Sequence, residues 1–466
     1  MAKERPEATS QELIVPKQKG SDRLLWANPY GWQDMDYGSS GVNGVAQEGI
    51  KRLREKGLDI VTVGPHVGDD KHNVADVIMG NTVDLPDWMT KITGTAYHVS
   101  LPFRKERAAA LVLRSEPDGI FVEQPDQGLH GHSLMSGAQI GEDGRILIPI
   151  MARFHGAIYN EAADLAYRLF LKSLKLARRP RFTRLGVTDG ISNTVLDNLQ
   201  LCLVTSEAIK RVSEIRYGKR EYKILSNGID VEKFAPKDSK HPAIDGWRED
   251  GKKIILIAMG RIEKRKGVIY GLEAYKIIKA KFPNVKLMVA GDGPEKKSIE
   301  EKASREKIED VHFTGRLPRA EYEMALRTAD VGIYPAIGGE GWGIVVGEGL
   351  ASGLLSVVSS ISGYDEVTEG GQPFSLMAEP KNPADIAEKT IKILDLSEEA
   401  RRNLKWEAAK FIRSRFAWEI VINQLAGHIQ SVLNNRTRVN WEEAREKYAR
   451  KAKFFPPSGT LFIAKK

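Results

Sequence analysis

The sequence predicts an α/β protein built from two successive Rossmann-like, parallel-sheet domains that face each other across a cleft. The chain has 466 residues, which is too long for one ordinary hydrophobic core. Strand-like and helix-like segments alternate along it, as expected for parallel sheets covered by helices. The alternation begins near residue 24 and begins again near residue 223, so we expect two α/β units with a ligand cleft between them.

The first unit opens with a strand, a glycine-rich loop, a helix and a second strand. The strand-like stretch LLWANPYGW (24 to 32) precedes the loop YGSSGVNG (37 to 44). VAQEGIKRLREKG (45 to 57) has the pattern of a helix closed by glycine, and LDIVTVGP (58 to 65) is a strand. Further buried strands are predicted over 119 to 124, 145 to 156 and 200 to 207.

The second unit repeats this pattern of apolar runs, glycine turns and helical periods. Strands are predicted over 252 to 260, 285 to 294, 307 to 315, 329 to 336 and 353 to 360. Helices are predicted over 267 to 282 and from about Val345. A long amphipathic helix, FAWEIVINQLAGHIQSVL (416 to 433), follows this unit.

These segments set the expected domain boundaries. The start of the chain is polar and lacks the apolar stretch of a secretory signal. The basic tail at the other end has no assigned role. We predict an N-terminal tail (1–21), a first Rossmann-like domain (22–225) and a second Rossmann-like domain (226–413). A C-terminal helix that crosses back to the first domain (414–435) and the basic tail (436–466) follow.

Composition limits the kinds of molecule that the protein could bind. The net charge of +8 favours an anionic binding partner, which could be nucleic acid, an anionic membrane face or a phosphorylated substrate, and the charge alone does not distinguish these three. The single cysteine, Cys202, excludes an internal disulfide and fits a reducing cytosol. The histidines have no cysteine partners at zinc-site spacing. No apolar run approaches the about 18 residues that a membrane-spanning helix needs.

A basic turn, GRIEKRKG (260 to 267), follows a predicted buried strand. Arg261 can donate two hydrogen bonds to a phosphate, and Lys266 adds a compact positive charge. A solvated basic turn would have the same composition, so this segment alone leaves both interpretations open.

The stretch GGEGWGIVVGEGLASG (338 to 353) shifts the balance towards a ligand site. The N-terminus of the helix that follows can accept a diphosphate. Glu340 in the loop can bind sugar hydroxyls, and Glu348, expected in the first helical turn, can accept hydrogen bonds from a ribose. In the alternative interpretation, Glu340 is an ordinary loop residue, and Glu348 only places a favourable negative charge near the start of the helix. Backbone amides can approach a ligand closely at the glycines of the loop, Gly338, Gly339, Gly341 and Gly343.

Four motifs together resemble one enzyme family. SNGIDVEKF, GRIEKRKG, AGDGP and GEGWGIVVGE are similar to segments of the retaining glycosyltransferases of family 4, which have the two-Rossmann GT-B architecture. The Glu-x7-Glu spacing of Glu340 and Glu348 is the signature of that family, and the resemblance covers roughly residues 22 to 433. Within the family the chain most resembles bacterial phosphatidylinositol mannosyltransferases, through NPYGWQDMDYGSSGVNGV and GGEGWGIVVGEGLASG.

The resemblance implies roles for individual residues. The first domain would bind the acceptor and the second the nucleotide sugar. Four residues would be catalytic: His155, Arg261, Lys266 and Glu340. Donor-binding residues would be Gly41, Arg261, Lys266, Glu340, Gly341, Trp342, Gly343, Ile344, Val345 and Glu348. Glu340 would hold the donor sugar, Glu348 the ribose, and Trp342 would pack the loop. Tyr37 and Asn43 would contact the acceptor, although the relatives have glutamine at the position of Asn43.

The implied reaction is hexosyl transfer with retention, in which the acceptor attacks the face from which the diphosphate leaves. The favoured donor is GDP-mannose and the favoured acceptor a lipid headgroup such as phosphatidylinositol. The alternative is a UDP-sugar with another lipid or a soluble sugar phosphate; a nucleotide-sugar epimerase is disfavoured by the Glu-x7-Glu pattern. We expect no cofactor or protein-bound metal, although Mg²⁺ could accompany the diphosphate. The Asp-x-Asp triplet at Asp34 and Asp36 is interpreted as coincidental.

A further segment suggests a membrane surface. In EAADLAYRLFLKSLKLARRPRFTR (161 to 184) an apolar arc borders a stripe of basic residues, Arg168, Lys172, Lys175 and Arg179. Such a helix could bind an anionic bilayer reversibly, or could pack its apolar arc on the sheet. We therefore expect a cytoplasmic, peripheral enzyme on the inner face of the membrane. The segment lacks the repeating aromatic residues of a nucleic-acid groove, and the sequence indicates no oligomeric state.

Overall fold

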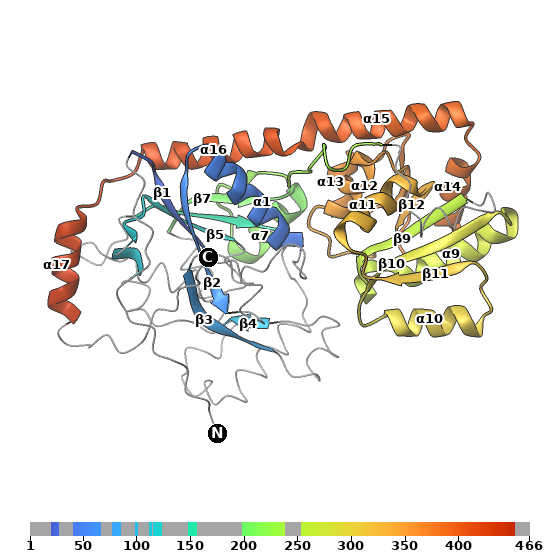
Figure 1. Ribbon diagram of the computed structural model, residues 1–466, viewed down its shortest axis with the longest axis horizontal. Helices are drawn as coiled ribbons and strands as arrows, with labels where there is room; N and C mark the ends of the chain where they lie inside the picture. Colours follow the sequence, from blue (N-terminus) through green and yellow to red (C-terminus); the bar gives the residue numbers. More distant parts are fainter. Residues whose placement is uncertain are drawn as a thin grey trace, which may run out of the picture.

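The structure is a computed structural model that describes residues 20–27, 41–66, 77–84, 98–100, 111–113, 115–123, 148–155, 198–237 and 253–452. Two α/β domains lie side by side, and a ridge of two successive long helices runs along both (Figure 1). This arrangement agrees with the predicted fold class.

The first domain is built on an eight-stranded sheet in the order β4-β3-β2-β1-β5-β6-β7-β8. Its described strand pairs are parallel except β3 with β4, which is antiparallel. Its elements are β1 (Arg23–Ala27), α1 (Gly41–Glu55), β2 (Asp59–His66), β3 (Val77–Asp84), β4 (His98–Ser100), β5 (Gly119–Glu123), β6 (Ile150–Phe154), β7 (Leu199–Val204), α7 (Glu207–Tyr217) and β8 (Lys223–Ile224).

The second domain has a six-stranded sheet in the order β11-β10-β9-β12-β13-β14, and each of its described pairs is parallel. Its strands are β9 (Lys253–Arg261), β10 (Val285–Asp292), β11 (Val311–Gly315), β12 (Val331–Tyr334), β13 (Ser356–Ser359) and β14 (Ser375–Ala378). Its helices are the short 3-10 helix η4 (Lys264–Lys266), α9 (Val268–Lys281), α10 (Lys296–Arg305), α11 (Arg319–Thr328), α12 (Ile344–Ala351), α13 (Ser362–Thr368) and α14 (Pro383–Leu394).

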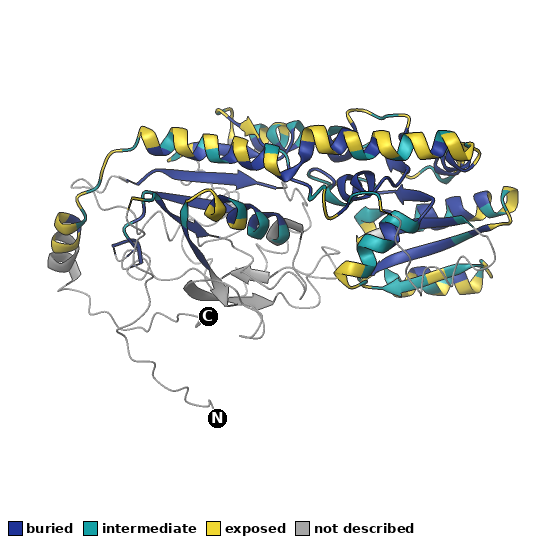
Figure 2. Ribbon diagram, turned by 45° about the horizontal axis from the view of Figure 1, so that its top comes forward, coloured by how far each residue is buried: buried dark blue, intermediate teal, exposed yellow. Residues whose placement is uncertain are grey.

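The central strands are continuous apolar runs because both faces of each sheet are buried in hydrophobic cores. All five residues of β1 are buried, as are all four of β12. In β9 the run Ile254–Ile257 is buried and packs into a core shared with α9 and α12. Figure 2 shows this buried interior beneath helices whose outer faces are exposed.

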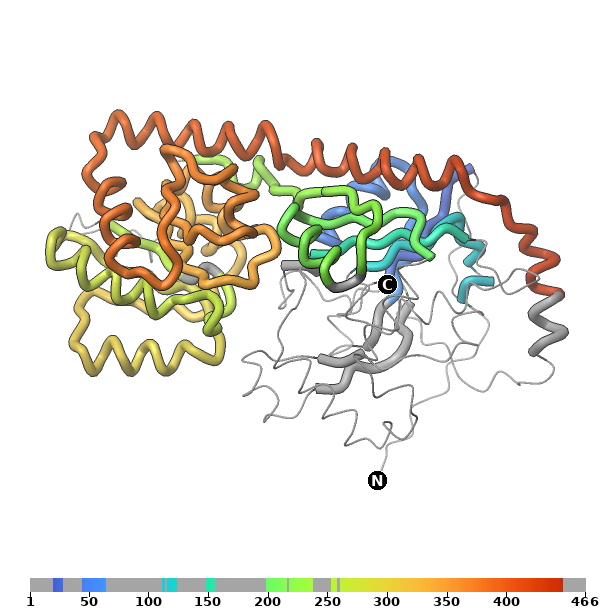
Figure 3. Tube along the Cα trace, turned by 180° about the vertical axis from the view of Figure 1, so that it is seen from behind, coloured from blue at the N-terminus to red at the C-terminus, as the bar shows by residue number. Residues whose placement is uncertain are grey.

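Two long helices connect the domains. α15 (Glu398–Phe416) contributes Phe411 and Ile412 to the core of the second domain. α16 (Trp418–Asn434) then packs its apolar face into the core of the first domain, beside α1 (Figure 3). The chain therefore returns from the second domain to the first.

The chain passes between the domains twice, near Ile229 and near Ala417, and these two segments are hydrogen-bonded to each other. The amide of Ile229 donates to the carbonyl of Phe416 at 2.7 Å, and the amide of Trp418 donates to the carbonyl of Ile229 at 3.1 Å. Gly228 lies directly against the Trp418 ring, where an added Cβ would approach a ring carbon to 2.3 Å. Only glycine leaves room for this packing.

The predicted strands that fall on described residues are confirmed as β1, β2, β5 to β7 and β9 to β13. The helix predicted from residue 45 begins four residues earlier, at Gly41. The basic tail contains a helix, α17 (Trp441–Ala452), that the sequence reading did not predict. Val439 and Trp441 pack against the core of the first domain.

Candidate functional site

The second sheet has a topological switch between its central strands. β9 and β12 are neighbours, but β9 leads to β10 on one side and β12 leads to β13 on the other. In open parallel sheets, ligands bind beyond the carboxyl ends of the strands at such a point. Here the chain after β9 and the loop 335–343 after β12 meet, and the amide of Ile337 donates to the carbonyl of Arg265 at 2.8 Å.

A cluster of charged side chains joins these two loops. Lys266 Nζ lies 2.7 Å from Oε1 of Glu340, and the Arg265 guanidinium forms an ion pair with the same carboxylate oxygen. Arg265 Nε also lies 2.6 Å from Oε1 of Glu263, which is buried. Two cations from the first loop therefore converge on one carboxylate from the second.

The electrostatics of this cluster keep Glu340 ionised. Burial raises the pKa of the Glu340 carboxyl, but Lys266 and Arg265 outweigh burial and hold that pKa below its usual value. Burial also opposes the charge on Arg265, while Glu340 and Glu263 raise the pKa of its guanidinium. The cluster is a preorganised set of opposite charges at the carboxyl edge of the sheet.

Glu348 occupies a second polar cluster, on α12. The Tyr322 hydroxyl donates to its Oε2 at 2.7 Å, and Arg319 Nη2 donates to its Oε1 at 3.0 Å. The Arg319 guanidinium in turn lies 4.8 Å from the centre of the Phe234 ring. Burial raises the pKa of Glu348 more than Arg319 and Tyr322 lower it. The expectation that Glu348 lies in the first turn is wrong: α12 begins at Ile344, so Glu348 is its fifth residue.

Along the chain, the N-terminus of α12 lies between Glu340 and Glu348. Gly343 precedes the helix with a φ of 83°, a left-handed conformation that suits glycine. The free amides of this turn, together with Lys266 and Arg265, can stabilise a diphosphate. Glu340 in the preceding loop and Glu348 within α12 can each accept hydrogen bonds from hydroxyl groups.

The other residues predicted for this loop take different positions. Arg261 lies at the rim, with a side chain 45% exposed and its Nε 3.7 Å from Glu263 Oε2. Trp342 is buried, and the centre of its ring lies 5.0 Å from that of Phe416, so its side chain packs against the end of α15. Ile344 and Val345 are the half-buried first residues of α12. The Gly341 carbonyl accepts a hydrogen bond from Ser206 of the first domain at 2.7 Å.

His155 lies in the first domain, directly after β6. Its Nε2 is 2.8 Å from Oε2 of Glu123, and Glu123 also accepts hydrogen bonds from Arg153 Nη2 at 2.7 Å and Trp26 Nε1 at 3.1 Å. Burial and then Arg153 lower the pKa of His155, against the opposing effect of Glu123. The pKa of Glu123 is lowered to about 2: burial raises it, but Arg153 and His155 prevail.

The remaining predicted residues lie outside the described part of the chain. These are Tyr37, the Asp34–Asp36 triplet and the basic stripe Arg168, Lys172, Lys175 and Arg179. Gly41 and Asn43 belong to the first turn of α1, but the description does not extend to their side chains. No helix in the described ranges combines the length and apolar content needed to cross a membrane.

Sequence reasoning missed five residues of these clusters. Arg265 and Glu263 belong to the same basic turn as Lys266, and the motif alone does not say which of its charges faces Glu340. Arg319 and Tyr322 lie on α11, and Glu123 ends β5. Their partners are distant in sequence, so only the folded structure brings them together.

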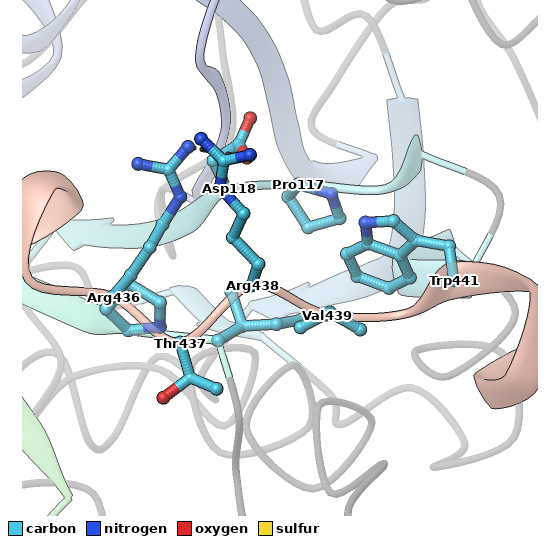
Figure 4. A pocket seen from close by; sticks show the side chains of 9 residues that line it. Pro117, Asp118, Arg436, Thr437, Arg438, Val439 and Trp441 are labelled. Atoms are coloured by element: carbon cyan, nitrogen blue, oxygen red, sulfur yellow. Dashed lines mark hydrogen bonds and ion pairs between the residues drawn. The ribbon is translucent and has the colours of Figure 1, made fainter.

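A pocket of about 250 Å³ lies elsewhere, at the amino edge of the first sheet (Figure 4). Pro117 and Asp118 before β5, Pro149 before β6, and Arg438 and Trp441 are among its lining residues. It is at the opposite end of the strands from His155. The switch point of the second sheet therefore remains the candidate site.

Comparison with known proteins agrees with this geometry. Residues 240–411, which include both carboxylate clusters except Phe234, match the family described as Glycosyl transferases group 1. This part of the chain is therefore similar to glycosyltransferases of group 1. A phosphatidyl-myo-inositol mannosyltransferase of Mycolicibacterium smegmatis is 31% identical to it over 203 residues, 43% of this chain and 50% of the relative. The chain thus spans about half the length of that relative.

Two longer matches extend beyond the group 1 domain. A sulfoquinovosyl transferase of Arabidopsis thaliana is 23% identical over 398 residues, covering 83% of this chain and 69% of the relative. A crystal structure of a glycosyltransferase from Rickettsia africae superimposes with a TM-score of 0.65 at 15% identity, covering 89% of this chain and 100% of that one. The predicted GT-B architecture is confirmed.

Proposed function

We propose that this protein is a retaining glycosyltransferase that moves a hexose from a nucleotide sugar to an acceptor held by the first domain. The observation that carries the proposal is the pair of carboxylates on either side of the α12 N-terminus, Glu340 with Lys266 and Arg265, and Glu348 with Tyr322 and Arg319. A nucleotide sugar has hydroxyl groups at both ends and a diphosphate between them. A loop carboxylate with two cations beside it, a helix N-terminus and a second carboxylate on that helix supply one kind of group for each of these parts.

In this proposal each group binds one part of the donor. Glu348 accepts hydrogen bonds from the ribose hydroxyls, and the α12 amides with Lys266 bind the diphosphate. As the glycosidic bond breaks, negative charge accumulates on the leaving diphosphate, so prepositioned cations lower the barrier. Glu340 contacts the hydroxyls of the transferred sugar. Its charge is already neutralised by two cations, which suits a positioning role better than attack on the sugar.

GDP-mannose is the donor we favour, and a lipid headgroup such as phosphatidylinositol is the acceptor. The support is the resemblance of the motifs and the name of the mycobacterial relative. The net charge of +8 suits an anionic lipid surface, where the enzyme would act peripherally on the cytoplasmic face. A UDP-sugar with another acceptor would use the same ribose and diphosphate contacts, and the experiment below separates the two.

The test is a thermal-shift panel of GDP-mannose, UDP-glucose and UDP-N-acetylglucosamine. A donor that binds only the folded state raises the melting temperature by mass action. We expect GDP-mannose to raise it for wild type and to raise it less for Glu348→Gln. Glu306→Gln is the matched control, because Glu306 pairs with Lys276 of α9 and Lys302 of α10 and belongs to neither carboxylate cluster.

The outcomes separate the parts of the proposal. A rise with a UDP-sugar alone would retain the transferase and discard GDP-mannose as donor. No rise with any donor would contradict the proposed function itself. If GDP-mannose binds, transfer of labelled mannose to phosphatidylinositol vesicles, compared with soluble inositol phosphate, then decides the acceptor. Retention is checked by the anomeric configuration of the product by NMR.

A further inference from the structure

The loop 335–343 after β12, called the donor loop below, is held from the first domain by a side chain that lies outside the sequence motifs. Ser206 follows β7 and is completely buried. Its hydroxyl donates to the carbonyl of Gly341 at 2.7 Å, across the domain boundary. Gly341 directly follows Glu340, so this hydrogen bond fixes the peptide next to the carboxylate of the ion cluster.

The same serine has a second role within its own domain. Ser206 is the N-cap of α7, and its side-chain oxygen accepts a hydrogen bond from the amide of Ile209 at 3.1 Å. One hydroxyl therefore accepts from its own helix and donates to the other domain. The orientation that caps the helix aims the hydroxyl proton away from the helix, towards Gly341.

Neighbouring contacts cross the boundary at the same place. The amide of Ala208, in the first turn of α7, donates to Oε1 of Glu366 on α13 at 3.2 Å. Ile344, the first residue of α12, packs against the core clusters of both domains. α13 itself lies close to the donor loop, because an added Cβ on Gly363 would come within 2.1 Å of the Glu340 carbonyl oxygen. The start of α7 thus contacts the donor loop and the helix that supports it.

This region also connects the donor loop with the end of β6, which is followed by His155. Thr205, the residue before Ser206, donates from its hydroxyl to the carbonyl of His155 at 3.4 Å. Two adjacent residues after β7 therefore contact the end of β6 on one side and the donor loop on the other. A movement of the domains apart would break the Ser206–Gly341 hydrogen bond while leaving the α7 cap intact.

We propose that Ser206 is a positioning residue that couples domain closure to the donor site: its hydroxyl, by donating to Gly341, holds the Glu340 loop in its binding conformation only when the domains are closed. The inference rests on the proposed function for its ligand, a nucleoside diphosphate, but the closure it describes is a property of the chain alone.

Three substitutions separate the two roles of Ser206. Ser206→Asp keeps an N-cap acceptor that ranks with serine, but an ionised carboxylate has no proton to donate and is repelled by the Gly341 carbonyl and by Glu366. Ser206→Ala removes both roles. Ser206→Thr keeps both and is the conservative rescue. If Ser206 only caps α7, domain closure and nucleotide affinity should decrease in the order Ser206→Thr, Ser206→Asp, Ser206→Ala. If its hydroxyl also holds the donor loop, Ser206→Asp and Ser206→Ala should be impaired alike.

Closure is measured without donor, on the full chain, by the distance between spin labels at Lys51→Cys on α1 and Lys297→Cys on α10. Both positions are exposed, whereas the native Cys202 is buried. We expect a short distance for wild type and Ser206→Thr, and a longer or broader distribution for Ser206→Asp and Ser206→Ala. Hydrogen exchange in α7 should stay slow in Ser206→Asp and become faster in Ser206→Ala.

Binding of GDP and UDP, measured by calorimetry, is the second readout. Loss of one neutral hydrogen bond predicts a rise in Kd of about 2- to 10-fold for Ser206→Asp and Ser206→Ala, with Ser206→Thr unchanged. The proposal is overturned if Ser206→Asp matches wild type in both distance and Kd, or if Ser206→Thr opens as far as Ser206→Asp. If wild type binds neither nucleotide, the proposed function fails, and the label distances still decide the role of Ser206.

Discussion

Nε2 of His155 lies 2.8 Å from Oε2 of Glu123, and both side chains are buried in the first domain. With its pKa lowered to about 2, Glu123 is an ionised, acceptor-only carboxylate at neutral pH. The proton of the neutral imidazole must therefore be on Nε2, which leaves Nδ1 as the acceptor nitrogen. Glu123 thus selects the tautomer and the orientation of His155, as second partners of functional histidines commonly do.

Removing the Glu123 charge should destabilise the first domain. Glu123→Gln leaves Arg153 buried without its counter-charge, which typically costs about 3–5 kcal/mol. The paired replacement Glu123→Leu with Arg153→Met removes both charges and should recover most of that loss. Urea unfolding of the full chain checks this. A double variant as unstable as Glu123→Gln would mean that the ion pair itself, and not the orphaned Arg153, determines the stability.

Acid should unfold the wild type through the same pair. Glu123 has a lower pKa in the folded state, about 2, than its ordinary value of 4.5, so its stabilising contribution is complete above pH 4.5 and is lost as the pH falls towards 2. The lowered pKa of buried, neutral His155 acts in the same direction, because protonation favours the unfolded state as the pH falls below its ordinary value of 6.5. Unfolding free energy measured against pH should therefore decline on acidification, and less steeply below pH 4.5 in Glu123→Gln. Equal slopes there would remove Glu123 as the cause.

Glu340 should compete with the diphosphate for its cations. Without donor, the Glu340 carboxylate is paired with Lys266 and Arg265, so a diphosphate that approaches Lys266 must displace or share that carboxylate. Glu340→Gln is therefore expected to bind GDP or UDP several-fold more tightly than wild type while transferring sugar more slowly. Lys266→Ala should weaken nucleotide binding and transfer together. Weaker binding of the free nucleoside diphosphate by Glu340→Gln would show that the carboxylate does not compete.

Tyr322 should contribute to binding of the ribose but not to binding of the diphosphate. Its hydroxyl donates to Glu348 at 2.7 Å, and Tyr322→Phe removes that hydrogen bond with little change in packing. The loss of one hydrogen bond to a charged group, worth about 1.5–3 kcal/mol, is an upper bound on the effect, so we expect a roughly 10-fold rise in the Kd of the nucleoside diphosphate. Inorganic pyrophosphate has no ribose and is the control ligand. An equal loss of pyrophosphate affinity would place Glu348 against the phosphates instead.

The sequence predicted the strands of both sheets where apolar runs are uninterrupted, as in β9 and β12, because burial on both faces leaves a pattern that needs no partner to be recognised. It did not predict β3, β4, β8 or β14. β4, β8 and β14 are short and lie at sheet edges, and the apolar run of β3 is interrupted by Gly80 and Asn81. The carboxylates Glu340 and Glu348 could be chosen from their motif. Arg319, Glu123 and Ser206 could not, because each derives its role from a partner 29, 32 or 135 positions away.

The final prediction concerns the return of the chain to the first domain. Trp418 is buried against Gly228, with Arg52 of α1 5.8 Å from the centre of its ring, so one side chain joins α16, α1 and the interdomain crossing. Trp418→Ala should lower stability by about 3–5 kcal/mol through the lost apolar contacts and the cavity left behind. The exposed Trp406 on α15 is the matched control, and Trp406→Ala should change stability by less than about 0.5 kcal/mol. Urea unfolding measures the stability of both variants.

Hydrogen exchange then shows which helices Trp418→Ala loosens. Because α16 packs into the first-domain core, we expect exchange to accelerate in α16 and in α1 but not in α9 or α14. Uniform acceleration in both domains would instead show that they unfold as one cooperative unit.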